Sequence, residues 1–574
     1  MKKVILLVLI LSKMSNAQKV NWTSFTPDIF QKAQQQQKPV LLHLAANWCH
    51  WCHVMEEKTY GDLNVIKYLN ENFIACTEDH DKRPDLANKY RDYGWPATIL
   101  FSPDGKELFK QAGFIEATEF LEILKKIKNE PNVVNITNHQ IKSTTPNTKN
   151  LYYIKKDVFN SIDLNRGGFA SPQKSVDFEM FEYAFNHLNN DTLKKWLKIT
   201  MKNSIYLTDK EWGGVYQYST YGDWVHPHYE KLLSVQARYI KMYLWYFYFT
   251  KDSTYFKLAL KNVNYVYRFL KKKDGTFANA QDADLIKGKK AHNFFKLKNE
   301  ERLKLGIPSI DTNAFTDNNS KIAESLIYLF WYTKDSTYLK DAITTIEYLI
   351  TKRFRKDSLF NHSYTNDFTP AIVDQIYPCK TLFLLYRATN NARYLKMAQK
   401  TMNAITYKFH KNNYVLSYLP LPGYLPPDAI VSENIETARL FNLYGKVFNK
   451  KEWIQIAKSI FDYLISDEVY EKIIVEPGIL TLSEEVEKEP LTGIYLVINL
   501  RNQDKALVQS MHQIPYFYYY AQAVMDFSVF PEKRELFESF NDNVLLFCTS
   551  TFCSAPIYQK EDLIQFLNKF FQKM

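Results

Sequence analysis

The stretch that decides the fold is NWCHWCHVMEE, residues 47–57, in which two residues separate Cys49 from Cys52. The preceding run PVLLHL, residues 39–44, is typical of a buried strand, and the residues after the motif indicate a helix. A cysteine between a strand and a helix lies near unpaired N–H groups and the positive end of the helix dipole. This position favours a thiolate at Cys49, which can form and break a disulfide with Cys52.

Other chemistries share this pattern. Haem attachment requires a pocket and usually a second axial ligand, and strand pairing around the motif leaves no obvious space for either. Zinc normally takes a second pair of ligands, for which Cys76 and His80 are candidates. The two cysteines of the motif could also form a buried, inert pair. We favour the redox interpretation, and we assign no metal site and no cofactor.

The segments around the motif predict an α/β domain of the thioredoxin-like kind over residues 18–130. A second strand is expected at 72–76, a third at 94–101 that is opened by a proline, a turn at 102–105 and a last amphipathic helix at about 118–128. Pro96 should lie opposite the cysteine pair after a cis peptide bond, because a proline opening a central strand otherwise removes a needed donor.

The start of the chain resembles an export signal. Met1-Lys2-Lys3 is followed by the apolar run VILLVLIL and then by the small residues Ser15-Asn16-Ala17. We expect a signal peptide over residues 1–17, a mature chain that starts at Gln18, and a periplasmic or secreted location. An uncleaved anchor is the alternative. No later run is apolar and long enough to predict stable membrane insertion after cleavage.

Composition limits the class of the mature protein. The net charge of +11 is scattered in short clusters interrupted by Asp and Gly, so no nucleic-acid partner is expected. Six cysteines in 574 residues are too few for a disulfide framework. A chain of this length suggests two or more domains.

Beyond an expected linker at 131–150, one pattern recurs over residues 151–535. A polar turn follows one helical pattern and precedes another at four places: TKDSTY at 250–255, TKDSTY at 333–338, TNNARY at 389–394 and, more weakly, FNKKEW at 448–453. Repeated helical hairpins of this kind predict an all-α domain in which neighbours bury each other's apolar faces. The repeat fits a closed ring or an open solenoid.

The longer links between these hairpins carry polar and aromatic residues. His228, Glu230, Asp282, Asp284 and Trp224 are candidate ligands of a carbohydrate, whose rings stack on aromatic faces and whose hydroxyls bind charged acceptors. The alternative is that the tryptophan packs in the core and the carboxylates cap helices.

Several motifs together resemble the spermatogenesis-associated thioredoxin-like family. They are WCHWCHVM at 48–55, DKRPD at 81–85, GWP at 94–96, PHYEK at 227–231, DAD at 282–284 and the paired cysteines of CTSTFC at 548–553. The resemblance implies a thioredoxin-like domain followed by an (α/α)6 barrel related to six-hairpin glycosidases and N-acylglucosamine 2-epimerases. A last segment, 536–574, would carry the paired cysteines.

The chain departs from the family at some positions. His43 lies where typical thioredoxins carry a buried acid, so it is a candidate base for the proton of Cys52, with a hydrogen-bonded core histidine as the alternative. Gln281 replaces a usual Glu, Tyr216 replaces a usual His, and Asn318-Asn319-Ser320 replaces a usual Trp-Asn-Gly. These changes weaken the inheritance of catalysis in the barrel.

Together these features predict an exported thiol–disulfide oxidoreductase that acts on protein thiols or disulfides through Cys49 and Cys52. Its barrel is expected to bind carbohydrate. One alternative is a carbohydrate-active epimerase or hydrolase with an accessory thioredoxin-like domain. The other is a binding protein without turnover.

Overall fold

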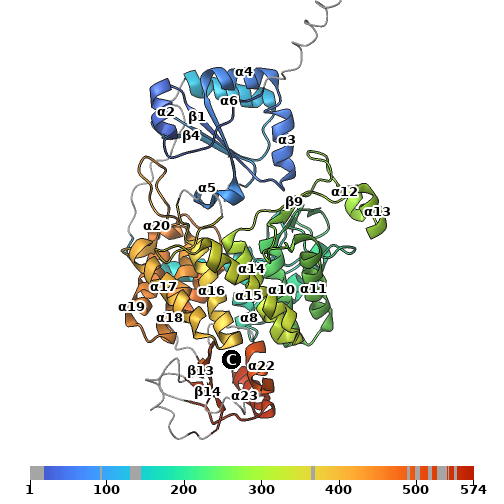
Figure 1. The fold of residues 1–574 in the computed structure, drawn as a ribbon, viewed down its shortest axis with the longest axis vertical. Helices are drawn as coiled ribbons and strands as arrows, with labels where there is room; N and C mark the ends of the chain where they lie inside the picture. The colour runs from blue at the N-terminus through green and yellow to red at the C-terminus, as the bar shows by residue number, and fades with distance from the viewer. Residues whose placement is uncertain are drawn as a thin grey trace, which may run out of the picture.

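The computed structural model shows an α/β domain in contact with one end of a body of helices (Figure 1). The structure describes residues 19–90, 94–129, 144–363, 369–487, 491–497, 505–514, 520–526, 540, 542–548 and 553–573. The expected signal peptide and most of the expected linker therefore lie outside the described residues. Across the described ranges, no helix combines the length and the apolar character needed to cross a membrane.

The first domain is built on a four-stranded sheet in the order β2-β1-β3-β4. β1 is parallel to β2 and antiparallel to β3, and β3 and β4 form the predicted hairpin. Separate apolar clusters cover the two faces of the sheet, which explains why β1 and β3 read as continuous apolar runs. The strands are β1 (Val40–Ala45), β2 (Ile74–Asp79), β3 (Ala97–Phe101) and β4 (Glu107–Ala112), and the helices are α2 (Ile29–Gln36), α3 (His50–Lys58), α4 (Leu63–Asn72), α5 (Pro84–Tyr90) and α6 (Ala117–Asn129). The predicted thioredoxin-like fold is confirmed.

The four predicted turns each join two antiparallel helices. In three of them a residue with positive φ ends the first helix, and an Asp or Asn then accepts a backbone N–H at the start of the second. The fourth turn also contains a residue with positive φ, Asn449, but lacks a side-chain cap, in line with its weaker sequence pattern. The hairpins are α10 (Leu233–Thr250) with α11 (Ser253–Tyr265), α14 (Thr316–Thr333) with α15 (Ser336–Arg353), α16 (Val373–Thr389) with α17 (Ala392–Lys408), and α18 (Val431–Val447) with α19 (Lys451–Leu464).

The helices close into a ring. The inner helices of the hairpins pack on one another in the order α10, α14, α16 and α18, and the circle is completed by α21 (Pro477–Glu487) and α8 (Phe178–Asn186), which packs on α10. The outer layer is completed by α7 (Thr148–Ser161) on α21 and α9 (Asp191–Ser204) on α8. Within the described residues this makes six inner and six outer helices, so the body is a closed (α/α)6 barrel and not an open solenoid.

The two ends of the barrel differ. The longer links gather at the mouth that faces the thioredoxin-like domain (Figure 1). They form β5 (Tyr218–Ser219), β6 (Pro227–His228), β7 (Lys231–Leu232), β8 (Ala280–Gln281), β9 (Ile310–Asp311), β10 (His410–Lys411), β11 (Tyr414–Val415), α12 (His292–Lys296), α13 (Asn299–Leu305) and α20 (Asp467–Tyr470). The far end carries a sheet of β13 (Tyr520–Asp526), β12 (Leu491–Val497) and β14 (Val544–Cys548) with α22 (Lys505–Gln513) and α23 (Lys560–Lys573). A disulfide there joins Cys548 to Cys553.

Candidate functional site

The cysteine pair lies where the sequence predicted it. β1 ends at Ala45, and Cys49 is the N-cap of α3, whose first turn contains Cys52. The two cysteines form a disulfide, and the backbone N–H of Cys52 donates to Cys49 Sγ at 3.1 Å. The Trp95–Pro96 peptide bond is cis, as expected, and Trp95 packs against the apolar cluster that contains both cysteines. The arrangement is that of a thioredoxin-like dithiol site.

The barrel covers this disulfide. Cys49 is 5% exposed and Cys52 is 0% exposed. Their neighbours are Trp48 and Trp95 from their own domain and Leu232 and Ala280 from two links of the barrel. The sulfur atoms are therefore buried between the two domains.

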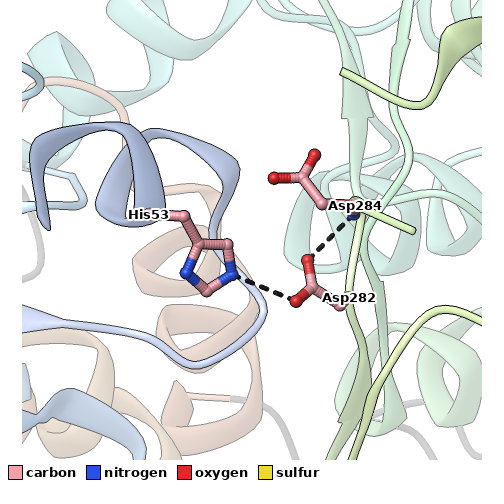
Figure 2. Close-up of side chains that lie close together, drawn as sticks. All are labelled: His53, Asp282 and Asp284. Carbon is pink, nitrogen blue, oxygen red and sulfur yellow. Dashed lines mark hydrogen bonds and ion pairs between the residues drawn. The ribbon is translucent and has the colours of Figure 1, made fainter. Parts of the chain in front are cut away.

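Two histidines of the motif bind the Asp-Ala-Asp loop of the barrel. His53 Nε2 lies 3.0 Å from Asp282 Oδ2, and His50 Nδ1 lies 2.8 and 2.9 Å from the two carboxylate oxygens of Asp284. Figure 2 shows the ring of His53 pointing from α3 toward both carboxylates, with the N–H of Asp284 donating to Asp282. Asp282 and Asp284 were predicted from the sequence as carbohydrate ligands, and the structure places both beside the cysteine motif.

His43 is isolated in the core. It lies on β1, buried between the rings of Trp22 and Tyr60, and neither ring nitrogen has a hydrogen-bond partner among the described residues. Burial lowers the pKa of His43 to about 3, so the ring is uncharged near neutral pH. The structure therefore gives it neither the hydrogen bonds of the alternative interpretation nor the basicity of a proton acceptor.

The other candidate zinc ligands have separate environments. Cys76 is a buried free thiol on β2, and burial raises its pKa to about 12. His80 stacks on Trp95 at 4.2 Å between ring centroids, and burial lowers its pKa to about 4.

A central cavity of about 470 Å³ occupies the mouth of the barrel. Trp48 and Trp95 form part of its wall on the side of the thioredoxin-like domain. On the barrel side, inner helices contribute side chains four residues apart from their first turns, which brings them onto one face. These are Ser234 and Arg238, Asp317 and Lys321, Val373 and Tyr377, and Ser432 and Glu436. Sequence reasoning missed this set, although polar residues four apart at the start of otherwise apolar helices could have indicated it.

Two buried carboxyl groups inside the barrel, Glu179 and Glu182, differ in protonation state. Burial, with Glu476 and Asp177 nearby, raises the pKa of Glu179 to about 8, so this side chain is largely protonated at neutral pH. Burial also disfavours ionisation of Glu182, which lines a separate cavity of about 110 Å³, but Arg439, 2.6 Å away, outweighs burial and lowers the pKa of Glu182. The barrel thus offers both a proton donor and ionised acceptors to a bound molecule.

A side cavity of about 420 Å³ lies on the other side of the cysteine motif. His50 and Trp51 line it together with His228, Glu230 and Asp284, so three of the predicted carbohydrate ligands meet there. The others do not line it. Asp282 is bound to His53, and Trp224 is buried with its indole N–H donating to the carbonyl of Arg166 at 2.7 Å.

A second contact joins the domains through the segment 79–90. His362 of the barrel binds the carbonyl oxygen of Asp81 at 2.7 Å and the carboxylate of Asp374 at 2.9 Å. Burial disfavours the charged ring, but Asp374 and Asp317 outweigh burial and raise the pKa of His362 to about 10. Arg83 is buried and pairs with Asp85 at 2.7 Å and Glu78 at 2.9 Å, and it also binds Tyr424 of the barrel.

A thioredoxin-like domain docked on the mouth of an (α/α)6 barrel is the class of protein that this fold defines. The model of the thioredoxin-like DsbH family, described as a protein of unknown function (DUF255), matches residues 10–147. Spermatogenesis-associated protein 20 of Mus musculus is 27% identical over 311 residues, which cover 46% of this chain and 39% of that protein. The match to the Homo sapiens protein is 25% over 310 residues, with the same shares. The predicted resemblance to the spermatogenesis-associated thioredoxin-like family is confirmed.

These relatives are matched over about two fifths of their own length. The thiol:disulfide interchange protein DsbD of Colwellia psychrerythraea is 34% identical over 124 residues, 20% of each chain. Among solved structures, cellobiose 2-epimerase from Bacillus thermoamylovorans has a TM-score of 0.45 and 14% identity, over 55% of this chain and 85% of that chain. The assignment of the barrel rests on the packing of its own helices.

Proposed function

We propose that this chain is an exported thiol–disulfide oxidoreductase in which Cys49 is the attacking thiol and Cys52 the resolving thiol. The observation that carries the proposal is the position of Cys49 as N-cap of α3, where its sulfur accepts the N–H of Cys52. Unpaired N–H groups at a helix start stabilise a thiolate, and the thiolate is the reactive form. Export rests on the basic and apolar start of the sequence.

The reaction follows from this geometry. In the reduced protein the Cys49 thiolate attacks one sulfur of a partner disulfide, and the other partner sulfur leaves as a thiolate. Cys52 then attacks Cys49, releases the second partner thiol and leaves the Cys49–Cys52 disulfide. Two electrons pass from the dithiol to the partner. Because Leu232 and Ala280 cover the sulfurs, a protein partner requires that the contact between α3 and the barrel loosens first.

Trapping of the mixed disulfide tests this assignment. Cys52→Ser should accumulate a covalent adduct with a disulfide substrate, because the resolving thiol is missing, whereas Cys49→Ser should form none. A Cys548→Ser/Cys553→Ser variant is the matched control, and it should react as the unmodified chain does. Equal adducts at both positions of the motif, or none, would refute the order of attack.

We also propose that the barrel binds a carbohydrate. Trp48, Trp95 and Tyr377 contribute aromatic side chains to the wall of the central cavity, and Asp317 and Glu436 are carboxylates that can accept sugar hydroxyls. The side cavity, with His228 and Glu230, is the second location that suits such a ligand.

Calorimetric titration with mono- and disaccharides separates the two cavities. Glu436→Gln should weaken binding in the central cavity, and Glu230→Gln should weaken it in the side cavity. If a sugar binds and its affinity is unchanged in Glu436→Gln, in Glu230→Gln and in Tyr377→Ala, neither cavity is its binding site.

Turnover of a sugar by an epimerase or hydrolase is the second candidate function, and the protonated Glu179 favours it. A carboxyl with a pKa of about 8 can donate a proton near neutral pH. Glu179→Gln should then abolish turnover of a bound sugar but preserve its binding. Unchanged turnover in this variant would exclude Glu179 as the acid.

A further inference from the structure

The Asp282 and Asp284 carboxylates present a problem of charge balance. They are 1% and 2% exposed, and ionised carboxylates at such depth need a positive partner. In the described part of the chain, no lysine or arginine forms a salt bridge with either of them, and the groups that face them are the imidazoles of His50 and His53. One divalent cation bound between the two domains would supply that partner.

We propose that a divalent cation of the zinc class binds between the two domains, with His53, Asp282 and Asp284 as its protein ligands. One nitrogen and two carboxylate oxygens of these residues lie within 4.8 Å of one another, and all three residues are buried. Imidazole and carboxylate are ligands that Zn²⁺ takes at about 2.0–2.2 Å. The ligands come from α3 on one side and from the Asp-Ala-Asp loop on the other (Figure 2).

The surroundings hold the carboxylates in place. Asp282 accepts the N–H of Asp284 at 2.9 Å and the hydroxyl of Ser309 at 3.1 Å. Asp284 accepts the N–H of Gly288 at 2.9 Å and contacts His50. Such outer contacts orient metal ligands and tune their affinity. Asp284 and His50 also line the side cavity, which gives an ion and its water ligand a path to the site.

A second buried cluster in the same interface, made of Asp317, His362 and Asp374, shows the opposite case. Its ligand atoms also lie within 4.8 Å of one another, but Lys321 pairs with Asp317 at 2.7 Å, and Asp374 and Asp317 raise the pKa of His362 to about 10, so that its ring is protonated. This cluster has its own cations, so it needs no metal and provides the matched control.

Metal content of the full chain tests the proposal. The protein is prepared without a metal-affinity tag, with its cysteines oxidised, stripped with a chelator and then titrated with ZnCl₂. We expect one zinc ion per chain and a rise in melting temperature. Asp282→Asn and Asp284→Asn should each weaken zinc binding by about 10- to 100-fold or more. Asp317→Asn should bind zinc as the unmodified chain does.

Cobalt provides a readout that does not depend on the variants folding. Co²⁺ added to the oxidised chain should give the visible absorption of a nitrogen–oxygen site of low coordination number, and zinc should displace it. Absence of cobalt and zinc binding would overturn the proposal. A thiolate-to-cobalt band that disappears in Cys49→Ser/Cys52→Ser, or equal loss of zinc in Asp317→Asn, would overturn it as well, because the ion would then be bound elsewhere.

Discussion

Two of the contacts that hold the thioredoxin-like domain on the barrel use different side chains. In one, α3 meets the barrel through His50 and His53, which bind the Asp-Ala-Asp loop, and through Trp51, which lies under Lys290. In the other, the segment 79–90 meets the barrel through Arg83 and Lys89, and through His362, whose pKa of about 10 keeps it protonated. We call the first the conditional contact, because it covers the cysteines and must loosen before they react with a protein partner, and the second the permanent contact.

Replacement of Arg83, in the permanent contact, should have the largest effect on the free energy of unfolding. Its replacement by Ala leaves Glu78 and Asp85 without their buried cation and removes the bond to Tyr424, so we expect the free energy of unfolding to fall by about 3–5 kcal/mol. Urea denaturation measures it. The neighbouring Lys82, half exposed and 3.8 Å from Asp79, is the control, and Lys82→Ala should cost about 0.5 kcal/mol or less. Similar losses in the two variants would mean that Arg83 is not a permanent anchor.

His362 should come next, with a dependence on pH. Its folded-state pKa of about 10 lies above the ordinary 6.5, so its stabilisation is complete below pH 6.5 and disappears as the pH rises through about 10. His362→Gln should lower the free energy of unfolding by about 2–3 kcal/mol at pH 7. The difference between the two proteins should shrink toward pH 10 in denaturation experiments. A constant difference from pH 7 to pH 10 would show that charge on this ring does not matter.

Weakening the conditional contact should lower the free energy of unfolding less, and should increase access to the Cys49–Cys52 disulfide more. Asp282→Asn/Asp284→Asn weakens the binding of His50 and His53, for which we expect a loss of about 1–2 kcal/mol. Reduction of the Cys49–Cys52 disulfide by dithiothreitol should become about tenfold faster, which corresponds to about 1.4 kcal/mol of easier opening. Mass spectrometry after alkylation follows it. Lys89→Ala, in the permanent contact, should leave this rate of reduction unchanged. Faster reduction in Lys89→Ala would mean that the two contacts open together.

His80 should have the smallest effect at neutral pH. It is uncharged there, since burial lowers its pKa to about 4, and its main contact is the stack on Trp95. The folded state binds a proton on this ring more weakly than the unfolded state does. The free energy of unfolding therefore decreases as the pH falls from 6.5 toward 4. His80→Phe keeps an aromatic face and should change the free energy of unfolding by less than about 1 kcal/mol at pH 7. Its stability should fall less than that of the unmodified chain on acidification to pH 5, and an equal fall would contradict this account.

Local signals predicted much of this molecule. The cysteine motif, the strand before it and the polar turns of the hairpins are short patterns whose structure depends on neighbours in sequence, and all of them formed as expected. The closure of the ring by α8 and α21 was beyond such reasoning, since it joins segments about 300 residues apart. The repeat fitted a solenoid equally well until this contact was seen.

The candidate site shows the same limit. Asp282 and Asp284 stood out because carboxylates on a link suit ligands, but their partners His50 and His53 are separated from them by more than 200 residues. Nothing in either motif indicates that they meet. Arg238 and Glu436 were missed because a polar residue in a helix is normally predicted to face solvent, whereas these two line the central cavity of the ring.

The separation along the chain between the cysteines and the residues that cover them also sets an order of events during synthesis. The thioredoxin-like domain leaves the ribosome first, and its contacts are mostly local, so it can fold early. Leu232 and Ala280 come much later in the chain, so they can cover the sulfurs only after that part of the barrel has been made. Until then the newly made cysteines are open to whatever oxidants and reductants surround them. A disulfide between Cys49 and Cys52 can therefore form before the barrel covers it.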